Sequence, residues 1–213
     1  RNSLLRKLQE RRGQLDELAF WDDELSEAGA TIIRARQRAL ERLGSDAAGR
    51  YPELGSEGET LDIRYQPALP EELQSTIPTD DFQAQFRQAI EEGRQQDVWR
   101  GATRFGPHRD DVAFLIGGHD AAISASRGQQ RTAALALRLS EVALSTETTG
   151  DPPVLLLDDI LSELDAHHRD RILHAAYAVD QVLITTPDGD RPGRSELPEA
   201  KRYMLEDGEL KPL

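Results

Sequence analysis

Apolar residues recur at helical spacing through the first 43 residues of the chain. One stripe, interrupted by Gly13, consists of Leu4, Leu5, Leu8, Leu15 and Leu18. A second stripe ends near Gly44 and consists of Phe20, Trp21, Leu25, Ala28, Ile32, Ile33, Ala35, Ala39, Leu40 and Leu43. Side chains spaced in this way lie on one face of a helix. The pattern predicts a helical hairpin or short arm, too short for a sustained coiled coil.

The next segment changes from a loop pattern to a strand pattern. Residues 45–59 are rich in glycine, serine and acidic side chains, which is typical of a loop. Leu61, Ile63 and Tyr65 then alternate with polar residues, which predicts a half-buried strand. Residues 112–123, centred on two glycines, are predicted to form a β-hairpin.

Between these strands the chain has a second helical pattern. It begins at a capping sequence, Thr79-Asp80-Asp81, and extends to about Trp99, which we expect in the core. One face of this helix carries the apolar residues Phe82, Phe86, Ala89 and Ile90.

Beyond residue 125 strands and helices alternate, which favours an α/β fold with a parallel sheet. A long helix is predicted over residues 132–144 and a second over 166–178. The unbroken apolar run 154–157 and the run 181–185 predict strands buried on both faces. A hairpin around Asp207-Gly208 is predicted at the end of the chain.

Two carboxylates, Asp158 and Asp159, follow the strand 154–157 directly. The carboxyl edge of a parallel sheet is where open α/β folds bind nucleotides. A carboxylate there can hold Mg²⁺ beside substrate phosphates. The alternative is a core strand that ends in an acidic turn.

A second candidate site precedes the helix 132–144, at Ser126-Arg127-Gly128-Gln129. A helix N-terminus presents unpaired N–H groups and the positive end of the helix dipole, so a phosphate could bind there. The alternative is that Ser126 serves as an ordinary N-cap.

Three motifs in sequence order resemble those of the RecF family of bacterial recombinational-repair ATPases. They are Gly106-Pro107-His108-Arg109-Asp110-Asp111, Ser126-Arg127-Gly128-Gln129-Gln130-Arg131-Thr132, and residues 155–165, which read Leu-Leu-Leu-Asp-Asp-Ile-Leu-Ser-Glu-Leu-Asp. The second resembles the signature loop of ABC-type ATPases in general, and the third resembles their Walker B strand and D-loop. The resemblance implies the C-terminal part of an ABC-type ATPase head, with a mixed or parallel sheet and helices, beside a mostly helical second lobe. We assign residues 1–100 to the helical lobe, with a short strand near 61–66, and residues 101–213 to the ATPase lobe.

The resemblance also implies roles for individual residues. Asp158 would orient Mg²⁺ through water, and Asp159 would position the attacking water or act as base. The signature residues Ser126, Arg127, Gly128 and Gln129 would contact the γ-phosphate of ATP held by a second subunit. Ser162 and Asp165 would lie in a D-loop at the dimer interface, with Thr185 and Thr186 in the switch region. Transporter ATPases usually have histidine in that region, which counts against a transporter subunit.

As a whole, the resemblance implies an ATP-dependent homodimer that clamps double-stranded DNA near single-strand gaps, at single-strand–double-strand junctions. Mediator proteins of the RecR and RecO kinds and a RecA-like recombinase would be its partners. Because Asp159 is one methylene shorter than the usual glutamate, hydrolysis is expected to be slow. The alternatives are the head of an SMC or double-strand-break-repair ATPase, or a non-enzymatic interaction fragment.

The charge of the chain conflicts with DNA binding. The 213 residues carry a net charge of −13, which opposes simple nucleic-acid binding. Up to Leu43 there are nine basic and eight acidic residues, a net charge of about +1. The basic clusters there supply the candidate DNA contacts Arg6, Lys7, Arg11, Arg12, Arg34 and Arg38. The alternative is a solvated helical surface.

Other features bear on completeness and location. The chain has no Gly-x-x-x-x-Gly-Lys-Ser/Thr phosphate loop, so either it is no ATPase or the part before Arg1 carries that loop. Because of the resemblance, we interpret the chain as the C-terminal portion of a longer protein. The absence of cysteine and of any apolar run of roughly 18 residues favours a cytoplasmic protein without a membrane span. His108, Asp110 and Asp111 could bind a metal or form a structural turn.

Overall fold

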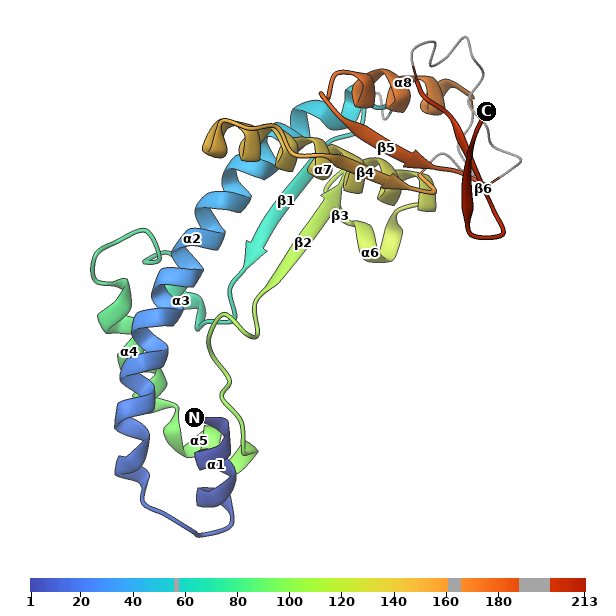
Figure 1. Cartoon of the computed structure of the whole chain (residues 1–213). Helices are drawn as coiled ribbons and strands as arrows, with labels where there is room; N and C mark the ends of the chain where they lie inside the picture. The colour runs from blue at the N-terminus through green and yellow to red at the C-terminus, as the bar shows by residue number, and fades with distance from the viewer. Residues whose placement is uncertain (56–57, 161–165, 188–199) are drawn as a thin grey trace. The chain divides into compact units, whose positions relative to one another are not determined.

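The computed structural model describes residues 1–55, 58–160, 166–187 and 200–213. The chain has an α/β fold and divides into two compact units (Figure 1). The first unit comprises Arg1–Ser45 and Leu61–Ile123, and the second comprises Asp46–Thr60 and Ser124–Leu213. The division differs from the predicted boundary at residue 100, because the three-stranded sheet formed by β1, β2 and β3 keeps residues 101–123 with the first unit.

The first unit is mainly helical. Its helices are α1 (Asn2–Gln9), the 3-10 helix η1 (Leu15–Glu17), α2 (Leu18–Glu53), α3 (Glu71–Gln74), α4 (Phe82–Glu92), α5 (Arg94–Arg100) and, at its end, α6 (Ala121–Ser124). The long α2 lies beside α4 in Figure 1 and continues into the second unit. The core cluster consists of Ala30, Ile33, Leu69, Leu73, Ile77, Phe82, Phe86 and Ile90. Phe82 and Phe86, one turn apart on α4, stack in this core, as the apolar face of the predicted helix indicated.

The helix predicted to end near Gly44 continues to Glu53, so the first part of the predicted loop 45–59 is helical. Glycine costs a helix about 1 kcal/mol relative to alanine, but it does not end one. At Gly44 an added Cβ would lie 3.3 Å from the carbonyl oxygen of Ile63, so glycine allows the close approach of the strand that contains Ile63. Burial of Ala47, Tyr51 and Leu54 then stabilises the last turns.

The single helix predicted over residues 79–99 is two helices, because α4 ends at Gly93 and α5 begins after it. Trp99 was expected in the core, and this is wrong, since its side chain is 77% exposed. Asp97 occupies the buried position of α5 instead, because its carboxylate binds two arginines. Phe20 and Trp21 at the start of α2 are also exposed and pack edge to face.

A buried ion network joins α1, α2 and α5. Asp22, fully buried, accepts hydrogen bonds from Arg1 Nε at 2.6 Å and Arg94 Nε at 2.6 Å. Asp97 accepts from Arg1 Nη1 at 2.7 Å and from Arg104 Nε at 2.9 Å. Two carboxylates therefore pair with three guanidinium groups that are largely shielded from solvent.

The first unit also contains an antiparallel sheet in the order β1-β2-β3. Its strands are β1 (Leu61–Gln66), β2 (Asp111–Ile116) and β3 (His119–Asp120). Strand β1 has the predicted alternation, with Leu61 and Ile63 buried. The predicted hairpin is confirmed only to Asp120, because residues 121–123 belong to α6, where Asp120 Oδ1 accepts from Ala122 N at 2.8 Å.

The Gly106–Asp111 motif forms a structural turn that fastens three segments through Asp110. The almost fully buried carboxylate accepts hydrogen bonds from the Tyr65 hydroxyl, from Ala68 N at 2.9 Å and from Arg36 Nη1 at 3.2 Å. Among the described residues no group of three or more His, Cys, Asp or Glu could hold a metal. The structure thus supports the structural-turn interpretation of this motif.

Stability at alkaline pH should depend on Tyr65. Burial and the hydrogen bond to Asp110 raise the pKa of the Tyr65 hydroxyl above its ordinary value of 10.0. A raised folded-state pKa contributes stability that is complete below about pH 10 and is lost as pH rises through that pKa. We expect Tyr65→Phe to cost about 1–2 kcal/mol at neutral pH, with the deficit shrinking above about pH 10. Melting temperatures of both proteins across this range would test it, and a deficit that stays constant would contradict it.

The second unit contains the elements that follow residue 125. They are α7 (Arg127–Thr149), β4 (Leu155–Asp158), α8 (Ala166–Tyr177), β5 (Val182–Thr185), β6 (Tyr203–Glu206) and β7 (Glu209–Pro212). Strands β4 and β5 pair in parallel, from Leu155 opposite Val182 to Asp158 opposite Thr185, as an α/β fold requires. The predicted C-terminal hairpin is confirmed as β6 and β7.

The expectation that β4 and β5 are buried on both faces is wrong for the described residues. Leu155 and Leu157 are buried, but Leu156 is 69% exposed, and its register partner Leu183 is exposed as well. The described sheet has two strands, and the face that carries Leu156 and Leu183 has no covering layer among the described residues. An unbroken apolar run cannot by itself reveal which of its faces is covered.

Candidate nucleotide-binding site

The predicted signature residues lie at the N-terminus of α7. Ser126 is its N-cap: Ser126 Oγ accepts from Gln129 N at 3.2 Å, and Gln129 Oε1 accepts from Ser126 N at 2.8 Å. This reciprocal pair is a capping box, which satisfies two N–H groups at the helix start. Ser126, Arg127 and Gly128 are exposed. The N-cap interpretation is therefore observed, and the exposed loop remains accessible to an anion.

The two predicted Walker B carboxylates lie at the carboxyl end of β4, and Thr185 of β5 contacts both residues. The Thr185 hydroxyl donates to Asp158 Oδ1 and accepts from Asp159 N at 3.1 Å. Asp159 N also donates to Thr185 O at 3.2 Å. Asp159 has a φ of +49°, a left-handed conformation that aspartate tolerates better than most residues. Thr185 therefore fixes the direction of the Asp158 carboxylate and holds the main chain of Asp159, contacts that sequence reasoning did not foresee.

If the full-length protein hydrolyses ATP, as the resemblance implies, the Thr185 hydroxyl should be needed for that activity. Thr185→Val keeps the side-chain shape and removes both hydroxyl hydrogen bonds, so magnesium-dependent ATP turnover should fall about 10- to 100-fold. Steady-state hydrolysis at varied Mg²⁺ concentration would measure it. Thr185→Ser is the matched control, since it keeps the hydroxyl and should retain most activity. Equal activity of the valine and serine variants would contradict the role.

The structure says less about the remaining candidates for the nucleotide site. Ser162 and Asp165 of the predicted D-loop lie outside the described residues. Thr186 follows β5, and its hydroxyl lies 3.5 Å from the carbonyl oxygen of Pro187. Helix α8 follows the predicted D-loop in the sequence, and its residues Ile172, Leu173 and Ala176 are buried, whereas Tyr177 is exposed.

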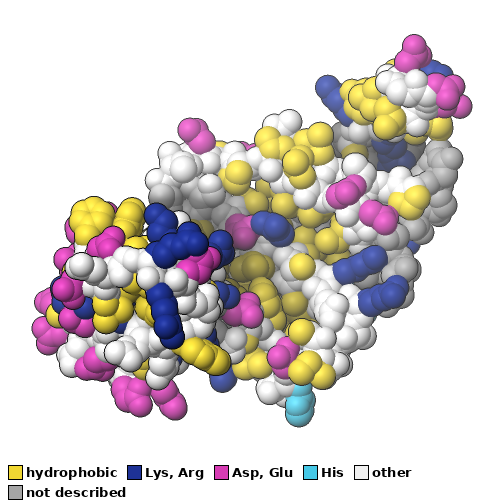
Figure 2. Space-filling view, turned by 90° about the horizontal axis from the view of Figure 1, so that it is seen from below, with side chains coloured by type: hydrophobic (Ala, Val, Ile, Leu, Met, Phe, Trp, Pro, Cys, Tyr) yellow, Lys and Arg dark blue, Asp and Glu magenta, His cyan; other side chains and the backbone are white. Residues whose placement is uncertain are grey.

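The candidate DNA contacts occupy two separate regions of the first unit. Arg6 and Lys7 are in the last turn of α1, with Arg11 and Arg12 just beyond it, and all four are exposed. Arg34 instead donates to the carbonyl oxygens of Ile77 and Thr79 and lies over the Phe82 ring, so it supports the fold, while Arg38 one turn further along α2 is exposed. In Figure 2 the lysine and arginine side chains lie among acidic and apolar ones.

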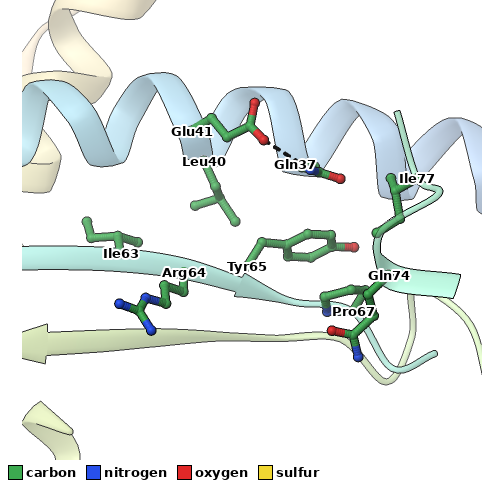
Figure 3. A pocket seen from close by; sticks show the side chains of 9 residues that line it. All are labelled: Gln37, Leu40, Glu41, Ile63, Arg64, Tyr65, Pro67, Gln74 and Ile77. Atoms are coloured by element: carbon green, nitrogen blue, oxygen red, sulfur yellow. Dashed lines mark hydrogen bonds between the residues drawn. The ribbon is translucent and has the colours of Figure 1, made fainter. Parts of the chain in front are cut away.

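A cavity of about 330 Å³ lies in the first unit between α2, β1 and α3 (Figure 3). One wall contains Gln37, whose Nε2 donates to Glu41 Oε1 at 3.0 Å. Tyr65 and Leu40 are among the other residues that line it. None of the lining residues is a predicted nucleotide contact, so the cavity adds nothing to the nucleotide site.

Sequence reasoning also missed Glu59, which it placed in a loop without a role. The Glu59 carboxylate accepts a hydrogen bond from Gln129 Nε2 at 2.7 Å and from the Tyr51 hydroxyl at 3.2 Å. A separation of 70 residues between Glu59 and Gln129 leaves no periodic signal. Only the fold brings the two side chains together.

Comparison with known proteins places the chain in its class. No family model matches it. It is 38% identical to the DNA replication and repair protein RecF of Thermomicrobium roseum, over all of this chain and 57% of that protein. RecF of Roseiflexus castenholzii is 40% identical, again over all of this chain and 55% of the relative. The chain thus spans about half the length of the curated relatives it matches.

Solved structures give the same result. The chain superposes on the recombination mediator protein RecF with ATP, of the RecFOR pathway, with a TM-score of 0.78 and 33% identity. The match covers all of this chain and 54% of that one. The fold and the site together define the C-terminal part of an ABC-type ATPase. More particularly, the chain belongs to the RecF family and matches the C-terminal half of RecF.

One further expectation concerned the membrane. Within the described residues no helix is both long enough and apolar enough to cross a bilayer.

Proposed function

We propose that the full-length protein is a DNA replication and repair ATPase that dimerises when it binds ATP, and that this chain supplies the trans-acting half of each site. The observation that carries the proposal is the exposed N-terminus of α7, where Ser126, Arg127 and Gly128 face solvent. A 23-residue helix directs its dipole and unpaired N–H groups toward a ligand at that end. The similarity to a RecF structure with ATP supports ATP as that ligand.

Mg²⁺ fits the carboxyl end of β4. Asp158 is exposed, and the Thr185 hydroxyl that donates to Oδ1 fixes the direction of the carboxylate. Mg²⁺ is commonly held by one or two carboxylates together with water and substrate phosphates, so a single fixed aspartate is an adequate protein ligand. The bound ion would neutralise charge on the phosphates. Asp159, held by its main chain to Thr185, would position the attacking water, with slow turnover because of its short side chain.

Duplex DNA near single-strand gaps is the proposed substrate of the dimer, with RecR-like and RecO-like mediators and a RecA-like recombinase as partners. The similarity to a RecF structure of the RecFOR pathway supports the choice of partners. The exposed cations Arg6, Lys7, Arg11, Arg12 and Arg38 are the candidate phosphate contacts of the first unit. Since the net charge of this chain is −13, binding should depend on these few residues and fall steeply with salt.

Light scattering of the full-length protein with and without Mg-ATP tests the proposal. We expect a monomer without nucleotide and twice that mass with it. Anisotropy of a labelled gapped duplex at several salt concentrations, with ATP present, then measures DNA binding. A monomer at saturating Mg-ATP would exclude the trans-acting signature, and salt-independent DNA binding would exclude the basic contacts.

A further inference from the structure

The carboxylate of Glu59 connects the signature loop to the C-terminal end of α2. Gln129 Nε2 donates to Glu59 Oε1 at 2.7 Å, and the Tyr51 hydroxyl donates to Glu59 Oε2 at 3.2 Å. All three residues belong to the second unit. Tyr51 lies in the last turns of α2 and is fully buried, so its hydroxyl is a fixed point in the core of that unit.

The hydrogen bond from Gln129 matters because the same side chain also forms the capping box. Gln129 Oε1 accepts from Ser126 N, while Gln129 N donates to Ser126 Oγ. Glutamine has three side-chain torsions, so a bond to Oε1 alone would leave its amide free to leave the cap. The second bond, from Nε2 to Glu59, fixes the amide plane and with it the direction of Ser126.

A second contact joins the end of α2 to the helix that follows the predicted D-loop. Gly55, with a φ of +113°, lies so close to His168 of α8 that an added Cβ would be 2.4 Å from His168 Cδ2. Arg171 Nη1, one turn along α8, donates to the carbonyl oxygen of Glu53 at 3.4 Å. The end of α2 thus contacts α8, and through Glu59 it is hydrogen-bonded to the signature loop.

We infer that Glu59 is a positioning residue that aligns the signature loop for ATP bound to the partner subunit, by tying Gln129 to Tyr51. The inference rests on the proposed ATP-dependent dimer. Tyr51 and Glu59 both lie in residues 46–60, a segment of the second unit that the chain forms between the two parts of the first.

The test compares four substitutions in the full-length protein. Glu59→Ala removes both hydrogen bonds. Glu59→Gln keeps an oxygen that can accept from Gln129 and an amide that can donate to the Tyr51 oxygen. Tyr51→Phe removes one donor and keeps the buried ring. Asp180→Ala, in the exposed segment between α8 and β5, is the control for loss of one negative charge in the same unit.

Light scattering gives the ATP concentration for half-maximal dimerisation, and equilibrium binding gives the ATP affinity of the monomer. Because the signature acts in trans, Glu59→Ala should raise the ATP concentration for half-maximal dimerisation about tenfold. The ATP affinity of the monomer should be unchanged. Tyr51→Phe should raise that ATP concentration for half-maximal dimerisation by a smaller factor. Glu59→Gln should bring it back to within about twofold of the wild-type value. A general loss of folding would lower ATP affinity too, and glutamine would not be expected to rescue it.

Hydrogen exchange of the peptide covering residues 124–134 is the independent measurement. Glu59→Ala should speed exchange there, and Asp180→Ala should not. If Glu59→Ala matches the control in both dimerisation and exchange, the inference is overturned. If the wild-type protein does not dimerise with ATP but Glu59→Ala still speeds exchange, the proposed function fails and the positioning of the loop by Glu59 stands.

Discussion

Substituting arginine for Ser126 is expected to abolish ATP-dependent dimerisation of the full-length protein. Ser126 is exposed at the first turn of α7, where the loop has room for a phosphate and the helix dipole favours one. A long side chain at this position would occupy the space of the γ-phosphate. It would also remove the cap on Gln129 N, which costs about 1 kcal/mol of helix stability. Light scattering with saturating Mg-ATP should then give the monomer mass.

Two control variants show whether dimerisation is lost through the bulk of arginine at this position or through loss of the helix cap. Ser126→Ala removes the cap without adding bulk, so dimerisation should weaken but persist at high ATP concentration. Thr148→Arg places the same charged side chain in the exposed last turn of α7, where it favours the helix dipole and should leave dimerisation intact. A Ser126→Arg protein that dimerises like the wild type would refute the trans-signature model, whatever the behaviour of Ser126→Ala.

The sequence predicted the fold well where the spacing of apolar residues alone decides the structure. Alternation in β1 placed Leu61 and Ile63 inside, and the apolar spacing of α4 placed Phe82, Phe86 and Ile90 inside. The errors arose where a tertiary partner overrides the local pattern. Gly44 does not end α2, because burial of Ala47 and Tyr51 stabilises the turns that follow it. Trp99 is exposed, because Asp97 of the same helix takes the buried side.

The candidate site likewise has residues that local sequence motifs select and contacts that only the fold creates. Motifs were enough to select Ser126, Asp158 and Asp159, since their residue types and order are unusual. The residues that orient them, Thr185 and Glu59, are joined to their partners only through the fold, across 27 and 70 residues. Neither hydrogen bond has a signature in spacing or composition. A single sequence therefore selects candidate residues for the chemistry, but it does not show which hydrogen bonds hold them in place.

Neutralising Asp22 is expected to destabilise the first unit by about 3–5 kcal/mol, because it leaves buried arginines without their counter-charge. Asp22 is fully buried, and its carboxylate accepts hydrogen bonds from Arg1 Nε and Arg94 Nε, each at 2.6 Å. Asp22→Asn keeps the size of the side chain but replaces one acceptor oxygen by an NH₂ group. In either amide orientation that group would face an arginine N–H, so one buried donor pair would be left unsatisfied.

The neighbouring Asp23 provides the matched control. It pairs with Arg87 across an exposed surface, where ion pairs contribute about 0–1 kcal/mol, so Asp23→Asn should change stability little. Both tryptophans of the chain, Trp21 and Trp99, belong to the same unit as Asp22, so urea unfolding followed by their fluorescence reports on that unit. If Asp22→Asn lowered stability by no more than Asp23→Asn, the two arginines would have to find other partners or solvent, and the network would not be what holds α1, α2 and α5 together.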